Sequence, residues 1–139
     1  AVIPYYAYGR TDKKDQPRVP ITARLIADCI TVAGAHRVLT MDMHAGQIQG
    51  FFNIPVDNIF AGPLFAKDVA ENNKMDDTII VSPAVGGVVR ARAMANKLHA
   101  DMAIVDKRRP AHNVAKVMNI IRDVEGKHCI FIDDIVATA

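Results

Sequence analysis

Two adjacent carboxylates, Asp133 and Asp134, follow a short apolar segment near the end of the chain. Residues 129–132 are rich in β-branched side chains, which is typical of a buried parallel strand. In open α/β sheets, ligands bind at the carboxyl ends of strands, where small residues let the backbone approach a phosphate or a sugar. Neighbouring strand residues point to opposite faces, so at most one of the two acids needs to face a ligand. A strand that ends in solvated acids explains the same residues equally well.

Three consecutive cations, Lys107, Arg108 and Arg109, follow another predicted strand, residues 102–105. Lysine supplies a compact charge and arginine a forked donor, and together they neutralise phosphate well. Because the cations follow the carboxyl end of a strand, phosphate binding is as good an explanation as a solvated loop.

An acid and an imidazole, Asp42 and His44, follow a third predicted strand, residues 38–41. A carboxylate and an imidazole so placed could bind a divalent ion or metal-bound phosphates. A single Asp-x-His pattern is weak evidence for this site, because surface histidines are common.

Aromatic and charged residues are mixed in the segment from Tyr5 to Arg18, which predicts an exposed loop that carries function. Arg10 could contact a phosphate or stack on a base, and Tyr8 could also stack. A solvated charged loop is the commoner explanation for such a composition.

Alternating strands and helices are predicted between these candidates. The predicted strands cover residues 1–4, 38–41, 78–81, 102–105 and 129–132, and the predicted helices cover residues 20–33, 64–72 and 88–98. Residues 111–118 are predicted to be partly helical and residues 119–124 to be extended. The β-α-β order occurs in both halves, which predicts an α/β fold with parallel sheets flanked by helices, in two similar lobes.

Apolar spacing also predicts the buried face of two helices. In residues 20–33 this face consists of Ile21, Leu25, Cys29 and Val32, with Ile26 and Ile30 beside it. In residues 88–98 it consists of Val88, Ala91, Ala95 and Leu98. Gly86 and Gly87 precede the second helix, where exposed N–H groups favour an anion, although a tight turn explains a Gly-Gly pair equally well.

The composition excludes several classes of protein. Half of the 139 residues are hydrophobic, which is enough for a core in one domain or in pieces of two. A net charge of +2 does not indicate a general nucleic-acid binder. The two cysteines, Cys29 and Cys129, lack the spacing of a disulfide framework or a zinc site, and no apolar run reaches membrane-spanning length. We therefore expect a cytoplasmic protein, and we expect both ends of the chain to be cuts through a larger one.

Taken together, these motifs resemble those of ribose-phosphate pyrophosphokinases, also called phosphoribosyl pyrophosphate (PRPP) synthetases. The resemblance covers essentially the whole chain and rests on residues 8–15, 18–23, 40–52, 81–87, 106–109 and 132–139. It implies two phosphoribosyltransferase-like α/β lobes, with the later part of the N-terminal lobe in residues 1–60 and the earlier part of the C-terminal lobe in residues 61–139.

The resemblance also implies an activity. Members of this family transfer the diphosphoryl group of ATP to ribose 5-phosphate, with Mg²⁺, and make PRPP for nucleotide biosynthesis. The expected partners are ATP and ribose 5-phosphate, together with further copies of the chain in a homo-oligomer, a hexamer in this family. No nucleic acid or membrane is expected as a partner.

On the ATP side, the resemblance assigns nucleotide binding to Arg10, Thr11 and Asp12, although Thr11 stands where the family usually has glutamine. His44 is expected to help hold Mg-ATP and is the residue assigned to the metal.

On the other side of the reaction, Lys107 and Arg109 are expected to be catalytic. They would lie on a mobile loop and stabilise charge on the transferring diphosphoryl group, which fits the reliance of such transfers on positioning and on cations. Asp133 and Asp134 are expected to face the ribose hydroxyls and the metal, and Thr138 to belong to the turn around the 5-phosphate.

Two positions depart from the family pattern. Ala84 replaces an aspartate linked to the metal, and Ala137 replaces the aspartate that begins the phosphate-binding turn. We therefore expect impaired activity. One alternative is a catalytically weak regulatory or assembly subunit of a PRPP synthetase. A second is a phosphoribosyltransferase, which would not require residues 8–15 or 40–52.

Overall fold

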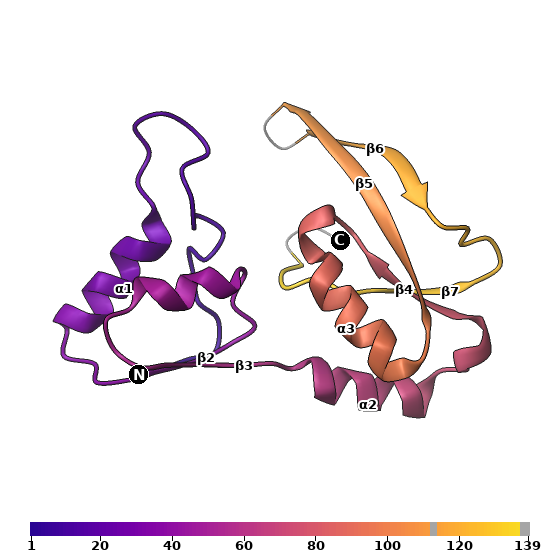
Figure 1. Cartoon of the computed structure of the whole chain (residues 1–139), viewed down its shortest axis with the longest axis horizontal. Coiled ribbons are helices and arrows are strands. Elements are labelled where there is room, and N and C mark those ends of the chain that lie inside the picture. The colour runs from indigo at the N-terminus through magenta and orange to yellow at the C-terminus, as the bar shows by residue number, and fades with distance from the viewer. Residues whose placement is uncertain (112–113, 137–139) are drawn as a thin grey trace. The chain divides into compact units, whose positions relative to one another are not determined.

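The computed structural model describes residues 1–111 and 114–136 and contains two compact units, Ala1–Ala61 and Gly62–Ala139 (Figure 1). The boundary between the units lies one residue after the boundary that the sequence predicts. Among the described residues, no helix is both long enough and apolar enough to cross a membrane.

The first unit is a three-stranded parallel sheet with helices packed on it. Its elements are β1 (Val2–Ile3), α1 (Thr22–Val32), β2 (Val38–Met41), the 3₁₀ helix η1 (Gly46–Phe51) and β3 (Val56–Ile59). The strand order is β1-β2-β3, and Leu39 of β2 pairs with Val2 on one side and with Asp57 on the other. The core of this unit consists of Tyr6, Ala23, Ala27, Val38, Met43, Ile48 and Phe52.

The predicted buried face of α1 is wrong. Ala23 and Ala27 are fully buried and Ile26 and Ile30 pack against the core, whereas Leu25 is 53% exposed and Val32 88%. The buried residues follow the i, i+3, i+4, i+7 pattern of a helix face. This stripe includes the two alanines, whose small side chains let the helix lie close to its neighbours. The predicted face is the adjacent stripe of the helix, which includes Leu25 and Val32.

The second unit has a mixed four-stranded sheet. Its elements are α2 (Gly62–Asn72), the 3₁₀ helix η2 (Met75–Asp77), β4 (Thr78–Ser82), the 3₁₀ helix η3 (Val85–Gly87), α3 (Val88–Leu98), β5 (Asp101–Ala111), β6 (Val114–Ile121) and β7 (His128–Phe131). The strand order is β6-β5-β4-β7. The central strand β4 is parallel to both β5 and β7, and β5 and β6 are antiparallel.

Strand β4 is buried along its whole length, because apolar groups pack on both of its faces. Ile80 packs with helix residues Ala66, Ala91, Met94 and Ala95, whereas Ile79 and Val81 pack with Ala103 and Val105 of β5. This arrangement follows from the two-residue period of a strand. The predicted inner face of α3 is confirmed at Ala91, Ala95 and Leu98, and Met94 adds to it.

The prediction of a partly helical segment in residues 111–118 is wrong. Ala111 ends β5 and Val114 begins β6, and these strands pair as an antiparallel hairpin. Strand β5 therefore includes residues 106–111, which the sequence placed in a loop. The segment from Val114 to Ile121 is rich in β-branched residues, which favour a strand once a neighbouring strand is available for pairing.

Candidate functional site

Two segments of the second unit meet at the carboxyl edge of its sheet. Strands β4 and β7 are parallel neighbours, with Val81 paired to Phe131, so both strands end at the same edge. The Ile132 amide then donates a 3.0 Å hydrogen bond to the carbonyl oxygen of Val81. This bond holds the start of the acidic segment, residues 132–134, beside the loop that follows β4.

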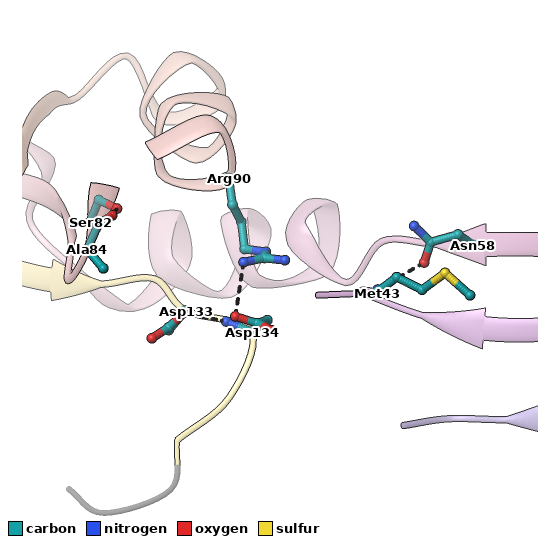
Figure 2. Close-up of polar contacts among 7 residues, drawn as sticks. All are labelled: Met43, Asn58, Ser82, Ala84, Arg90, Asp133 and Asp134. Carbon is teal, nitrogen blue, oxygen red and sulfur yellow. Dashed lines mark hydrogen bonds and ion pairs between the residues drawn. The ribbon is translucent and has the colours of Figure 1, made fainter. Parts of the chain in front are cut away.

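The loop after β4 is fixed by a buried hydroxyl. Ser82 is fully buried, and its Oγ donates a 2.7 Å hydrogen bond to the carbonyl oxygen of Ala84 (Figure 2). Gly87 lies so close that a β-carbon built on it would be 2.9 Å from Ser82 Oγ. Ala84 is exposed and presents only a methyl group to solvent.

The two acids differ in their surroundings. Asp133 is exposed, and one of its carboxylate oxygens accepts a 2.9 Å hydrogen bond from the backbone N–H of Asp134 (Figure 2). The side chain of Asp134 is only 8% exposed, and its Oδ1 lies 3.4 Å from Nη1 of Arg90. Partial desolvation, followed by the interaction with Asp134, raises the pKa of Asp133 above the ordinary aspartate value.

The backbone places the cationic segment, residues 107–109, beyond the same carboxyl edge of the sheet. Ser82, the last residue of β4, pairs with Ile104 of β5, and β5 continues to Ala111. Lys107 therefore lies three residues beyond the end of β4, about 10 Å at the rise of a strand. Arg109 follows on the same strand. Thr138 and Ala137 lie outside the described residues.

The predicted ATP-binding residues are grouped within the first unit. A β-carbon built on Gly9 would lie 3.5 Å from Cβ of His44, so the loop that carries Arg10 passes directly beside His44. The Thr11 amide bonds to the carbonyl oxygen of Tyr8, which has a φ of 66°. The structure thus brings together two segments that are more than thirty residues apart in the sequence.

A hydrogen bond joins the same two segments a few residues further on. The side-chain amide of Gln47 donates a 2.8 Å bond to Asp12, which fixes that carboxylate against η1. Gln47 was not among the residues that sequence reasoning selected. Its partner lies in a loop that no local pattern connects to η1.

The side chain of Asp42 binds a backbone amide. The residue has a φ of 45°, and its carboxylate accepts a 3.2 Å hydrogen bond from the Ala61 amide. The Met43 amide donates a 3.1 Å bond to the side-chain oxygen of Asn58 (Figure 2). These bonds close the turn between β2 and η1, and the turn sets the position of His44.

The donor atoms of the second unit fit a magnesium ion that is shared with a substrate. Mg²⁺ commonly takes one or two carboxylates and fills its remaining positions with phosphate oxygens and water. Asp133 presents an exposed carboxylate of this kind. In the part of the chain that the structure describes, no three His, Cys, Asp or Glu side chains gather to form a protein-only metal site.

Two family models match the chain. One describes the N-terminal domain of ribose phosphate pyrophosphokinase and matches residues 1–34. The other describes a phosphoribosyl transferase domain and matches residues 55–139. Both compact units are therefore covered in part or in full.

Several proteins named ribose-phosphate pyrophosphokinase are similar in sequence. The protein of Granulibacter bethesdensis is 64% identical over 135 residues, which cover 97% of this chain and 44% of the relative. The protein of Caldanaerobacter subterraneus is 60% identical over 139 residues, which cover the whole chain and 44% of the relative. The chain thus spans less than half the length of these relatives.

Similarity also extends to solved structures. One of them is the crystal structure of phosphoribosylpyrophosphate synthetase from Mycobacterium smegmatis, with a TM-score of 0.85 and 40% sequence identity. The similarity covers 96% of this chain and 43% of that chain.

Proposed function

This chain belongs to the ribose-phosphate pyrophosphokinase family, and from that premise we propose that it carries parts of the two sites at which ATP and ribose 5-phosphate react to form PRPP. The observation that carries the proposal is the meeting of the Ser82–Gly87 loop with Asp133 and Asp134 at one edge of a sheet. This edge offers carboxylates for sugar hydroxyls beside a helix start that favours a phosphate.

In this proposal the second unit binds ribose 5-phosphate. The exposed Asp133 accepts hydrogen bonds from ribose hydroxyls. Asp134 is the second carboxylate of the acidic segment. Thr138 belongs to the turn that receives the 5-phosphate. The first unit contributes Arg10, Thr11, Asp12 and His44 to the binding of ATP.

The proposed reaction joins the anomeric hydroxyl oxygen of ribose 5-phosphate to the β-phosphorus of ATP. The bond from that phosphorus to the oxygen bridging to the α-phosphate breaks, AMP leaves, and the hydroxyl proton is lost. Negative charge builds up on the transferring group, and Lys107 and Arg109 would stabilise it electrostatically. Mg²⁺ would supply further charge neutralisation. In the first unit His44 would help hold Mg-ATP, and in the second unit Asp133 would offer its carboxylate to the ion.

Ala84 supports the further proposal that activity in this chain is impaired. Its exposed methyl group has no oxygen to offer a metal, at the position where the family has an acid. The scaffold of this loop is nevertheless kept, because Ser82 still bonds to the carbonyl oxygen of Ala84. We therefore expect substrate binding to survive better than turnover.

Binding of ribose 5-phosphate to the 139-residue chain tests the site. In amide NMR spectra, ribose 5-phosphate with Mg²⁺ should shift the signals of residues 82–87 and 132–134. Asp133→Asn should weaken this binding about tenfold, as expected when a charge-assisted hydrogen bond is lost. Asp76→Asn is the matched control, because Asp76 is an exposed acid next to the amino end of β4. Equal effects of the two substitutions would refute the site.

A turnover assay tests the impairment. The chain is incubated with ATP, ribose 5-phosphate and Mg²⁺, and PRPP and AMP are measured. We expect little product, and robust PRPP formation would contradict the proposal.

Ala84 also favours a second candidate, a regulatory or assembly subunit that acts through an active synthetase. Mixing the chain with an active PRPP synthetase should then change the rate of that enzyme and the size of its oligomer. If the chain is instead part of an enzyme of this family, we expect that enzyme to be a homo-oligomer, a hexamer, in the cytoplasm. A mixture in which neither rate nor size changes would remove this candidate.

A further inference from the structure

Arg90 links helix α3 to the acidic segment that follows β7. Its Nη1 lies 3.4 Å from Oδ1 of Asp134, across a sequence separation of 44 residues. The side chains of Arg90 and Asp134 are 27% and 8% exposed, so the pair lies largely out of water. Figure 2 shows Arg90 extending from the helix toward this carboxylate.

The low exposure of Asp134 makes a nearby cation important. Transferring a carboxylate out of water is costly, and a cation beside it offsets part of that cost. A separation of 3.4 Å is longer than an ideal charge-assisted hydrogen bond, so the contact acts mainly through charge. Arg90 therefore stabilises the position of the Asp134 carboxylate more than it fixes a single bond geometry.

Asp134 is connected in turn to its neighbour. Its backbone N–H donates a 2.9 Å hydrogen bond to the carboxylate of Asp133. The order of contacts is thus Arg90, Asp134, Asp133, and the last of these is exposed to solvent. These contacts connect Arg90 to the exposed acid through Asp134.

From these contacts we propose that Arg90 is a positioning residue for ribose 5-phosphate: it holds Asp134 and thereby orients the carboxylate of Asp133 toward the sugar. This inference rests on the proposed function, because it takes Asp133 to be the sugar-binding acid. It also divides the work of the two acids, with Asp134 anchoring the segment and Asp133 contacting the ligand.

Arg90→Gln tests the proposal, because glutamine keeps much of the side-chain length and hydrogen-bonding capacity but lacks the charge. Arg90→Lys restores the charge. Arg92→Ala is the matched control, since Arg92 lies on the same helix and is exposed. Two measurements are made on the 139-residue chain: the ¹⁵N order parameter of the Asp134 amide without ligand, and the Kd for ribose 5-phosphate with Mg²⁺.

We expect Arg90→Gln to lower the order parameter and to weaken ribose 5-phosphate binding about tenfold. Arg90→Lys should recover most of both, and Arg92→Ala should change neither. The amide signals of β4 should keep their positions in all variants, which excludes unfolding of the second unit as the cause.

The outcomes separate this inference from the proposed function. An unchanged order parameter in Arg90→Gln overturns the positioning role, and so does a mobile Asp134 with unchanged affinity for the sugar phosphate. If the unsubstituted chain does not bind ribose 5-phosphate at all, the proposed function fails and so does the role of Arg90 toward the sugar. A fall in the order parameter would then support only the contact between Arg90 and Asp134.

Discussion

Gly87 lies so close to Ser82 that a β-carbon at position 87 would be 2.9 Å from the serine hydroxyl oxygen. The hydroxyl has little freedom to move away, because Ser82 is fully buried and bonds to the carbonyl oxygen of Ala84. The φ of Gly87 is −89°, which any residue can adopt. Position 87 therefore requires glycine because of this contact and not because of its backbone conformation.

Gly87→Ala is expected to destabilise the second unit by about 1 to 3 kcal/mol, because it overpacks a buried site. The measurement is urea unfolding followed through amide signals of β4. Gly86→Ala is the control and should stay within about 0.5 kcal/mol, since a β-carbon there would have no neighbour within 4 Å. If Gly87→Ala costs no more when Ser82 is present than in a Ser82→Ala background, the contact is not the cause.

Because of Tyr6, the first unit is expected to lose stability at alkaline pH. The buried Tyr6 hydroxyl donates a 2.8 Å hydrogen bond to the carbonyl oxygen of Ala23, and the Tyr6 ring packs edge-on against Phe52. Burial, and to a smaller extent the charge of Asp28, raises the pKa of Tyr6 to about 12. The unfolded chain ionises at a lower pH than the folded one, so folding loses stability as the pH rises from about 10 to about 12.

This loss should amount to about 2 to 3 kcal/mol, since each unit of pKa difference is worth about 1.4 kcal/mol. Tyr6→Phe should remove the pH dependence and cost about 1 kcal/mol at neutral pH, through the lost hydrogen bond. Urea unfolding at pH 8, 10 and 12 measures both effects. Tyr5→Phe, at an exposed neighbouring position, should leave the alkaline loss intact; a loss that persists in Tyr6→Phe would assign it to another group.

The β-α-β unit from β4 to β5 could be predicted from the sequence because its signals are local. Apolar residues in β4, two glycines before α3 and a regular apolar stripe on α3 each lie within one element. The antiparallel pair of β5 and β6 could not be predicted in this way, because Val114–Ile121 becomes a strand through pairing with β5. Pairing between segments leaves no periodic signature in either segment alone.

In the candidate site, too, local features could be predicted from the sequence and contacts between distant segments could not. The strand-end positions of Asp133 and of the Gly-Gly pair follow from the pattern of each segment. The contact of Arg90 with Asp134 and that of Gln47 with Asp12 join residues 44 and 35 positions apart. Only the packing of the helices on the sheets brings such pairs together, so sequence reasoning passed over Arg90 and Gln47.

Thr40 carries a buried hydroxyl that has no hydrogen-bond partner within the described residues. Thr40→Val keeps the side-chain shape and removes this group, so it should stabilise the first unit by about 1 kcal/mol. Thr78→Val is the matched control, because the buried Thr78 hydroxyl donates a 2.7 Å bond to the carbonyl oxygen of Lys74, and its removal should destabilise. Destabilisation by both substitutions in urea unfolding would show that the Thr40 hydroxyl does have a partner.

Asp133 and Asp57 should respond to pH in opposite directions. The pKa of Asp133 is raised, first by partial burial, so the folded state retains a proton that the unfolded chain has lost. Its contribution to stability is present at low pH and is lost as the pH rises through the folded-state pKa. The hydrogen bonds from Arg37 lower the pKa of Asp57, so that contribution is present at neutral pH and is lost as the pH falls.

Asp133→Asn should therefore raise Tm slightly at pH 7 relative to the unsubstituted chain, and the gain should disappear toward pH 3. Asp57→Asn should lower Tm slightly at pH 7, and this loss should disappear over the same range. Thermal unfolding of both variants between pH 3 and 7 makes the comparison. Trends of the same sign would contradict the surroundings described for one of the two acids.

Ala84 offers the sharpest test of impaired metal binding. Its side chain is exposed and its backbone is held by Ser82, so an aspartate fits without displacing buried atoms. Ala84→Asp should tighten Mg²⁺ binding in the presence of ribose 5-phosphate about tenfold, because a second carboxylate joins Asp133 around a cation that prefers oxygen ligands. Isothermal titration calorimetry measures the change. Val85→Asp is the control, since it adds the same charge at the next exposed position. A gain no larger than that of Val85→Asp would mean that local charge alone is responsible, and position 84 would then explain nothing about activity.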